Sequence, residues 1–587
     1  MNLKPEFFLP VLITALVGCA ADHEVKTEQG EIKQPASQTQ ILPPKKQELQ
    51  EKQLEASIAS QDASSPEPRL SITPALASKH KIANQAQELA SFQAPNRLNP
   101  FAAADIQSSY YQDSDREKYA TITQNPVKQV ASDPVSTFSI DVDTGSYSNI
   151  RRLLNQGTLP PVDAVRIEEM INYFDYAYQI PEPGNQPFSI QTELALSPWS
   201  EGHALLRIGL KGYEPNFEKR PAANLVFLLD VSGSMNAPDK LPLLKKSLLM
   251  LSQQLTEQDN VAIVVYAGAS GVVLEPTPGN QSLKIEQALE SLAAGGSTNG
   301  QAGIHLAYQL AKQSFDPQGI NRVILATDGD FNVGLSDVDA LKKLIEQKRQ
   351  DGIALTTLGF GTGNYNDHLM EQLADVGNGH YAYIDSLNEA RKVLVEQLAS
   401  TLITIASDVK IQVEFNPAVV KEYRLLGYEN RSLAREDFNN DKVDAGEIGA
   451  GHTVTALYEL VLQGSEAQRI DPLRYQEAKP SKGKTASTAN NELAFIKLRY
   501  KATQASQSQL ISRPVLMPEQ MTAFTKASED FRFAASVAAF GETLRNSKYI
   551  SGLDYNTLIN HALAAKGSDP FGYRSEFIQL LRLASAL

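Results

Sequence analysis

Five oxygen-bearing side chains stand at three places in this sequence where strands or loops of one domain are expected to meet. Asp230 closes an apolar run, with Ser232 and Ser234 two and four residues later. Asp328 follows a second apolar run, and Thr298 lies in a loop that contains two glycines. Hard cations such as Mg²⁺ choose carboxylate and hydroxyl oxygens, whereas zinc and copper favour His or Cys. These residues therefore predict a site for Mg²⁺, with Mn²⁺ as a second candidate.

An α/β domain is expected to position these side chains. Between residues 222 and 403, short apolar runs alternate with segments of helical periodicity, which is typical of a parallel sheet covered on both faces. The runs lie at 225–229, 261–265, 323–326 and 353–358. Leucines repeat at three- and four-residue spacings between the first two runs, which predicts one buried helix face there. We therefore expect a doubly wound, Rossmann-like domain with a mostly parallel sheet over 222–403.

The topology of such a domain can bring the five side chains to one point. In open α/β sheets, ligands bind just beyond the carboxyl ends of the strands, and Asp230 and Asp328 each stand at such an end. The alternative is that Ser232 and Ser234 cap a turn and a helix, with no metal. Capping does not need five oxygen-bearing residues from three separate loops. The metal site is therefore the favoured interpretation.

The motif Asp230-x-Ser232-x-Ser234, together with Thr298 and Asp328, resembles the metal-ion-dependent adhesion site of the von Willebrand factor type A domain. All five coordinating positions of that site are matched. The resemblance implies a bound Mg²⁺ and a partner protein that offers an Asp or Glu carboxylate to the metal. It implies a binding protein and not an enzyme.

The segments on either side of the α/β domain are β-rich. Apolar and polar residues alternate through 138–143, 206–211 and 409–415, which predicts half-buried strands. We expect residues 131–221 and 404–517 to form one β-sandwich into which the α/β domain is inserted, and residues 518–587 to be mainly helical. The flanks resemble the N-terminal and C-terminal domains that surround such a domain in a group of bacterial lipoproteins, most distinctively from Asp444 to Tyr458.

The single cysteine, Cys19, follows an apolar run from Phe7 to Val17. This run is too short to span a bilayer and has the length of a secretory signal's apolar core. Leu16-Val17-Gly18-Cys19 resembles a lipobox, so we expect residues 1–18 to be a lipoprotein signal peptide and Cys19 to carry lipid. Ala20 and Ala21 follow instead of an Asp, which resembles the pattern of lipoproteins sent to the outer membrane, here facing the periplasm. The alternative is an ordinary signal peptide with an incidental cysteine.

A disordered tether is expected over residues 19–130. Phe, Tyr and Trp are absent from Asp22 to Ser91, and a segment so poor in large apolar groups cannot offset its ordering entropy by burial. Ordered structure is expected to begin near Ala131.

The composition of the 587-residue chain excludes several classes of protein. It has 54 Lys and Arg against 68 Asp and Glu, a formal charge of −14, and no basic run, which argues against nucleic-acid binding. One cysteine excludes an intramolecular disulfide framework, a cysteine-ligated zinc site and an iron–sulfur cluster. Gly483-Lys484-Thr485 ends like a P-loop, but Ala478 stands where the first glycine is required, so no nucleotide is expected.

Two acidic motifs match known sites only in part. Asp141 and Asp143 are spaced as in haloacid-dehalogenase-type phosphatases, but Gly145 stands where that family has Thr or Val, so solvated strand carboxylates or a helix cap are favoured. Asp437, Asn439 and Asp441 have the first spacings of an EF-hand loop. Lys442 and Ile448 replace its required Gly and Glu, which favours an acidic surface turn. His305 and His452 are expected to be packing or surface residues.

We therefore predict a lipid-anchored protein of the cell envelope whose von Willebrand factor A-like domain binds a protein ligand through Mg²⁺. Two alternatives remain open at this point. One is an envelope scaffold or assembly factor that makes its contacts without the metal, and the other, less favoured, is a metal-dependent hydrolase.

Overall fold

The computed structural model describes residues 117–182, 186–215, 219–329, 338–471, 491–502, 507–550 and 552–587. All of them belong to the second of two compact units, Ile106–Leu587. The predicted signal peptide, Cys19, the predicted tether up to residue 116, and the P-loop-like residues 483–485 lie outside the described residues. Within the described part of the chain, every helix is too short or too polar to cross a bilayer.

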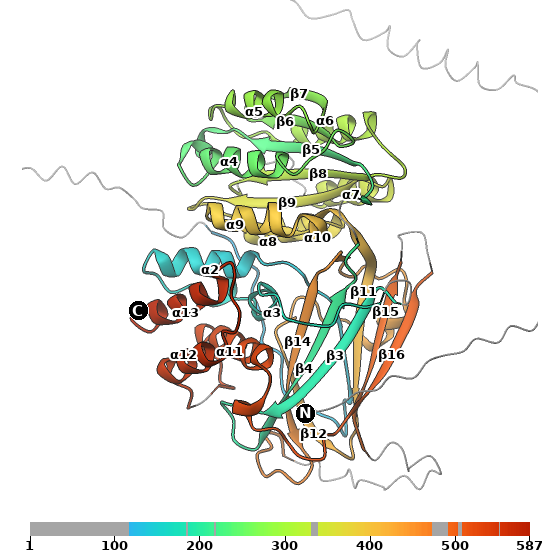
Figure 1. Ribbon diagram of the computed structural model, residues 1–587, viewed down its shortest axis with the longest axis vertical. Helices are drawn as coiled ribbons and strands as arrows, with labels where there is room; N and C mark the ends of the chain where they lie inside the picture. Colours follow the sequence, from blue (N-terminus) through green and yellow to red (C-terminus); the bar gives the residue numbers. More distant parts are fainter. Residues whose placement is uncertain are drawn as a thin grey trace, which may run out of the picture. The chain divides into compact units, whose positions relative to one another are not determined.

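The α/β domain is built on a six-stranded sheet (Figure 1). The strand order is β10-β9-β8-β5-β6-β7, and only β7 runs antiparallel to its neighbour. The strands are β5 (Ala223–Asp230), β6 (Asn260–Tyr266), β7 (Ser270–Pro278), β8 (Ile320–Thr327), β9 (Ala354–Phe360) and β10 (Tyr381–Ile384). Every residue of β5 is buried, which explains its continuous apolar run. The expected doubly wound fold is confirmed.

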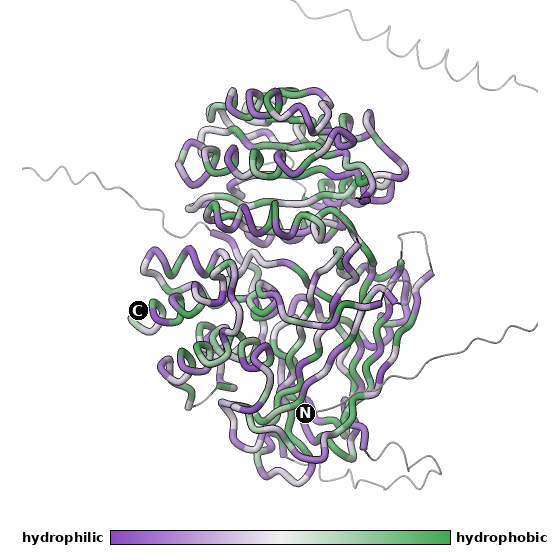
Figure 2. The backbone as a smooth tube through the Cα atoms, viewed as in Figure 1, coloured by the Kyte–Doolittle hydropathy of each residue, from purple (hydrophilic) through white to green (hydrophobic). Residues whose placement is uncertain are grey.

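Helices cover both faces of this sheet. Apolar residues of α4, α5, α9 and α10 form one core with the sheet, and those of α6, α7 and α8 form a second core on the opposite face. Figure 2 shows hydrophobic segments along the strands between helices of mixed colour. The helices are α4 (Leu241–Ser252), α5 (Ser282–Glu290), α6 (Gly300–Gln313), α7 (Val338–Gln350), α8 (Asp367–Val376), α9 (Leu387–Arg391), a π-helical turn (Lys392–Glu396) and α10 (Leu398–Leu402).

Strands from both flanks form a β-sandwich. One sheet has the order β1-β12-β14-β4-β3, and the other has β13-β11-β15-β16 with β2 also paired to β11. The first sheet contains β1 (Lys128–Gln129), β3 (Phe188–Leu196), β4 (His203–Gly212), β12 (Val420–Leu426) and β14 (Thr453–Leu462). The second contains β2 (Val135–Ser139), β11 (Thr404–Phe415), β13 (Ile448–Gly449), β15 (Glu492–Lys501) and β16 (Gln509–Leu516). Their inner faces share one core.

Pairing across the insertion joins the two flanks. The strand β2, which precedes the α/β domain, pairs with β11, which follows it. The strand β4 likewise pairs with β14 along its length. The α/β domain is therefore inserted between segments that form a single sandwich, as the alternating patterns had predicted.

A layer of helices covers the outer face of the first sheet. It combines two helices of the N-terminal flank with the three last helices, which share one core (Figure 1). They are α2 (Gly145–Asn155), α3 (Ile167–Asn172), α11 (Glu529–Leu544), α12 (Tyr555–Ala564) and α13 (Tyr573–Ala584). The hydroxyl of Ser528 caps α11 by accepting from the Phe531 N–H at 3.1 Å. Gly541 lets α11 approach α3 closely, since an added Cβ would lie 3.0 Å from Ile167.

This helical layer corrects the prediction that the sandwich strands are half-buried. All residues of β4 except Lys211 are buried. The apolar face of β4 lies in the sandwich core, and Leu205 on its other face packs in the helical core. Arg207 shares that face and is buried with its guanidinium 5.2 Å from the ring of Tyr178. The polar residues that alternate along β4 therefore face the helical layer and not solvent.

Residues 117–130, which the sequence assigned to the tether, instead belong to the folded part, and we call them the N-terminal strap. At one end, the Lys118 N–H donates to the Tyr365 carbonyl at 2.9 Å, and the Gly363 N–H donates to the Glu117 carboxylate at 3.2 Å. At the other end, β1 pairs with β12. The strap thus joins the sandwich to a loop of the α/β domain.

Candidate metal centre

Asp230 ends the central strand β5, and three donors fix its carboxylate. Oδ1 accepts from the Ser232 N–H at 2.9 Å. Oδ2 accepts from the hydroxyls of Thr327, at the end of β8, at 2.9 Å and Tyr266, at the end of β6, at 3.2 Å. Asp230 is fully buried, at 0 % exposure. Its orientation is therefore set by the ends of three neighbouring strands.

Burial raises the pKa of Asp230 above its ordinary value. Hydrogen bonds from Ser232 act in the opposite direction, and the negative charge of Asp328 raises the pKa further. Asp230 and Asp328 stand at the carboxyl ends of the neighbouring parallel strands β5 and β8, so the two carboxylates lie in one small region. Such a region favours a cation, which would stabilise both ionised carboxylates.

The two serines lie on the loop that follows β5. Their hydroxyl oxygens are 3.0 Å apart. Ser232 is buried and Ser234, in a 3-10 turn over Gly233–Asn236, is exposed. The site therefore has a closed side at Asp230 and an open side at Ser234.

Thr298 lies on the loop between α5 and α6. The Gly296 carbonyl accepts from the Gly233 N–H at 3.0 Å, and the Gly295 N–H donates to the Val231 carbonyl at 2.8 Å, so this loop and the serine loop are held together. Gly296 has a φ of +84°, a conformation that favours glycine. The structure thus brings all five predicted residues to the carboxyl edge of one sheet, on adjoining loops.

Sequence reasoning missed a lysine at this centre. The Lys240 ammonium lies 2.8 Å from Oδ2 of Asp328, and both residues are buried. Its methylene chain passes over Gly361, where an added Cβ would overlap Lys240 Cγ. Gly361 has a φ of +73°. Nothing in the spacing of the motif points to Lys240, because its reach depends on this turn after β9.

The donor set fits a hard cation. All five candidate ligands are oxygens, and among the described residues Lys240 pairs with Asp328 whereas no Lys or Arg pairs with Asp230. Ser232, Ser234 and Thr298 could coordinate through their hydroxyls, with Asp230 and Asp328 acting directly or through water. Thr327 and Tyr266, which the sequence analysis did not select, would orient the Asp230 carboxylate.

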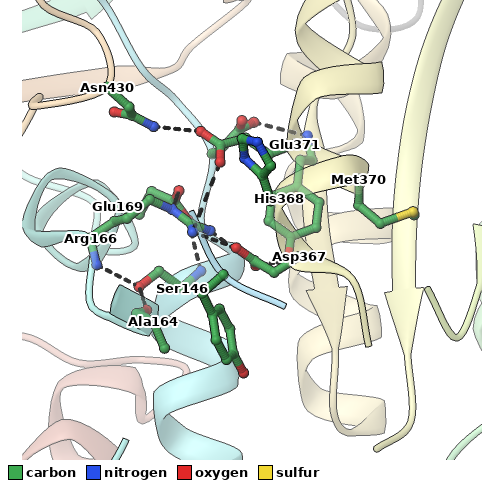
Figure 3. Close-up of polar contacts among 12 residues, drawn as sticks. Ser146, Ala164, Arg166, Glu169, Asp367, His368, Met370, Glu371 and Asn430 are labelled. Carbon is green, nitrogen blue, oxygen red and sulfur yellow. Dashed lines mark hydrogen bonds and ion pairs between the residues drawn. The ribbon is translucent and has the colours of Figure 1, made fainter. Parts of the chain in front are cut away.

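A second group of carboxylates lies at the junction of α8 with the flanks (Figure 3). Oxygens of Asp141, Glu169 and Glu371 all lie within 4.8 Å of one another, and all three residues are buried. We call these residues, with the two arginines described next, the junction cluster. Three carboxylates this close could share a metal ion, so the hydrogen-bond donors around them decide their role.

Two buried arginines already neutralise the junction cluster. Arg166 pairs with Glu169 and, through two nitrogens, with Asp367 of α8. Arg431 donates to Asp141 at 3.1 Å and to Glu371 at 3.3 Å. These contacts join the α/β domain to both flanks, and we interpret the cluster as structural.

Burial raises the pKa of Glu371 to about 7 and that of Glu169 well above its ordinary value, while the nearby arginines lower both. Asp143 also has a raised pKa, mainly through burial and the charge of Asp141. Asp141 and Asp143 pair with Arg431. They are therefore neither solvated strand carboxylates nor a helix cap, because the α/β domain packs over them.

The remaining sequence candidates have other surroundings. The Lys410 ammonium donates to the carbonyls of Asp437, at 3.3 Å, and Asn440, at 2.6 Å, within the acidic turn that resembled an EF-hand. His305 is exposed on α6. His452 is half-buried and lies beside the buried His380, with ring centroids 5.3 Å apart.

Three family models match the sequence. The von Willebrand factor type A domain matches residues 224–397, a model described as von Willebrand factor matches 113–207, and the C-terminal domain of Uncharacterized protein YfbK matches 400–587. The central match coincides with the α/β domain that carries the five candidate ligands.

Similarities to individual proteins and to one solved structure are as follows. Uncharacterized protein YfbK of Escherichia coli is 48 % identical over 83 % of this chain and 84 % of its own. Human inter-alpha-trypsin inhibitor heavy chain H3 is 24 % identical over 41 % of this chain and 29 % of its own. A von Willebrand factor type A structure from Catenulispora acidiphila covers 68 % of this chain and 91 % of its own, at 15 % identity and a TM-score of 0.37.

Proposed function

Because this chain belongs to the family of the Escherichia coli protein YfbK and contains a von Willebrand factor type A domain, we propose that it is a non-enzymatic binding protein that captures a protein partner through Mg²⁺. Domains of this type often bind proteins through such a metal. The partner would offer an Asp or Glu carboxylate. Mn²⁺ would serve in place of Mg²⁺.

One observation carries this proposal: two buried carboxylates and three hydroxyls on adjoining loops leave one side open to solvent. Asp230 is immobilised by three hydrogen bonds, so it cannot swing out to solvent. Ser234 is exposed, so a partner can approach from its side. The bound metal would supply a positive charge at this opening, which attracts an acidic group.

The residues of this chain would divide the work between them. Ser232, Ser234 and Thr298 would hold the cation through neutral oxygens, which leaves it incompletely neutralised. Asp230 and Asp328 would balance part of its charge, and Lys240 would already balance part of Asp328. An acidic side chain from the partner would complete the neutralisation, so metal and partner should bind cooperatively.

Isothermal titration of the full chain with Mg²⁺ and with Mn²⁺ tests the metal. Asp230→Asn keeps the size of the side chain and removes its charge, and Asp351→Asn, at a half-exposed carboxylate, is the matched control. We expect heat with the wild type and with the control, and none with Asp230→Asn. Equal heat from all three proteins would contradict the metal site.

We also propose that lipid on Cys19 anchors the protein in the cell envelope. The proposed location is the periplasmic face of the outer membrane. The lipobox-like sequence around Cys19 supports this proposal. The mass of the mature chain tests it, because acylation after removal of residues 1–18 has a defined mass. A mature N-terminus without lipid would contradict the anchor.

A metal-independent scaffold is the second candidate, and Lys240 is the observation that favours it. Its ammonium can neutralise Asp328 without a metal. Capture of partners from envelope extract, with Mg²⁺ or with EDTA, separates the two candidates. The contacts of a scaffold should survive EDTA, whereas a metal-bridged partner should be lost.

A further inference from the structure

A groove of about 470 Å³ lies between α4 and α5, on one flank of the α/β domain. Its surface is mostly apolar, and exposed lining residues such as Lys246 and Ala293 open it to solvent. The residues that line it are Met235, Asn236, Leu241, Pro242, Lys245, Lys246, Leu249, Glu286, Leu289, Glu290, Leu292, Ala293 and Ala294. Neither the metal centre nor the packing of the domain accounts for this groove.

The groove opens at the metal centre. Met235 and Asn236 directly follow Ser234, and Ala293 and Ala294 directly precede the glycines of the Thr298 loop. The hydrogen bond from the Gly233 N–H to the Gly296 carbonyl joins these two loops. One end of the groove is therefore continuous with the loops that carry three of the candidate ligands.

The groove is held open by one lysine. The Lys245 ammonium, on α4, donates to the carbonyls of Glu290 and Leu292 at the end of α5, at 2.8 and 2.9 Å. This bridge fixes the spacing of the two helices and satisfies carbonyls that the end of α5 leaves without helical donors. The groove therefore exists without a ligand.

The charged residues of the groove do not select for ligands of either charge. Two lysines and two glutamates line it, so their formal charges cancel. Its walls are instead leucine, methionine, proline and alanine side chains, including Leu249 and Leu289. Burying apolar side chains against such a surface lowers the free energy of binding. The surface discriminates only weakly among polar side chains.

We propose that the groove binds a large apolar side chain, Leu, Ile, Met or Phe, from the same partner segment whose carboxylate binds the metal. This inference rests on the proposed metal-bridged function. It adds an apolar residue to the acidic residue that the partner's sequence must contain. Leu249 lies about two helical turns, or about 11 Å, from the metal end of the groove. An extended chain advances about 3.3 Å per residue, so the apolar residue lies within about three residues of the acidic one. The metal recognises any accessible carboxylate, and the groove selects among them.

A peptide selection on the full chain tests this inference. The probe is a displayed library with a fixed Asp between two stretches of four random residues, bound in Mg²⁺ and released with EDTA. We expect the released peptides to carry Leu, Ile, Met or Phe within three residues on one side of the Asp. Replacing that residue by Ala in a selected peptide should weaken binding roughly ten- to a hundredfold, as expected for one buried apolar side chain.

Two groove variants and one control complete the experiment. Leu249→Lys places a charge in the groove two helical turns from the metal end, and Ala293→Trp, at an exposed position, fills the groove by volume. Leu283→Lys, on the exposed face of α5 at 66 % exposure, is the matched control. The apolar preference should disappear in both groove variants and persist in the control.

The possible failures are distinguishable. Peptides that are released by EDTA but show no apolar preference, or a preference that survives both groove variants, overturn the groove and leave the metal function intact. A wild type that yields no EDTA-released peptides and no heat with Mg²⁺ overturns the proposed function, and the groove assignment with it.

Discussion

The metal centre and the junction cluster both bury several carboxylates, yet they differ in what neutralises them. At the junction, Arg166 and Arg431 reach the carboxylates from other elements and satisfy them inside the protein. At the metal centre, Lys240 pairs with Asp328, no basic residue in the described part of the chain pairs with Asp230, and one side stays open to solvent at Ser234. A buried acidic group that basic side chains neutralise is structural, whereas one without a basic partner beside an opening is suited to a ligand.

The largest expected effect breaks the junction side of this comparison. Arg166→Met leaves Glu169 and Asp367 buried without their guanidinium, and removal of one partner from a buried ion pair costs about 3–5 kcal/mol. Urea unfolding should show this loss. Arg391→Met, in a half-exposed pair with Glu396, should cost about 1 kcal/mol or less. Equal losses would contradict the structural role of the junction cluster.

The next effect breaks the metal side. Mg²⁺ at a hundred times its Kd should stabilise the wild type by about 2.7 kcal/mol, and Asp230→Asn should abolish that gain. Without metal, the variant should be as stable as the wild type or more stable, because burial already disfavours the ionised Asp230. Thermal unfolding with and without Mg²⁺ measures both quantities. A variant that is strongly destabilised without metal would place Asp230 with the structural carboxylates.

A third change sharpens the comparison by removing a positive charge from the metal centre. Lys240→Met removes the ammonium that lies 2.8 Å from Asp328. Mg²⁺ should then bind about tenfold more tightly, which corresponds to about 1.4 kcal/mol, and calorimetry should detect the change. Lys246→Met, at an exposed position on α4, is the control and should leave the affinity unchanged. Weaker Mg²⁺ binding in Lys240→Met would show that the ammonium supports the metal site.

The smallest expected effect concerns pH at the junction. The pKa of Glu371 is about 7 in the folded protein, above its ordinary value of 4.5, so the folded state holds a proton that the unfolded state releases. Its contribution to stability is complete below about pH 4.5 and is lost as pH rises through 7. Glu371→Gln should therefore flatten the decline in urea stability between pH 5.5 and 8, by on the order of 1 kcal/mol.

Two histidines, the buried His380 and the half-buried His452, oppose this trend and must be separated from it. Burial lowers the pKa of His452 to about 3 and that of His380 well below its ordinary value, so their contribution is lost as pH falls below about 6.5. The difference between wild type and Glu371→Gln at each pH cancels the histidine effect. An unchanged slope in the variant would show that Glu371 stays ionised in the folded protein.

The five candidate ligands could be predicted because each stands at the end of a strand or in a loop of a strongly periodic domain. Lys240 could not, since its position depends on a turn at Gly361 that lies far along the chain. The edge strands β7 and β16 were also missed, because prolines and charged residues interrupt their patterns. The double burial of β4 depends on α11, which is more than three hundred residues away.

The N-terminal strap also determines where a mechanical load would enter the protein. A pull on the chain ahead of Glu117 acts first on the hydrogen bond from Lys118 to Tyr365 and on the Glu117 carboxylate, before it reaches any strand of the sandwich. The backbone at Tyr365 and Asn366 packs against Gly329, the residue after Asp328, so closely that no Cβ would fit there. Tension on the N-terminal side would therefore be felt beside the metal centre before the rest of the fold.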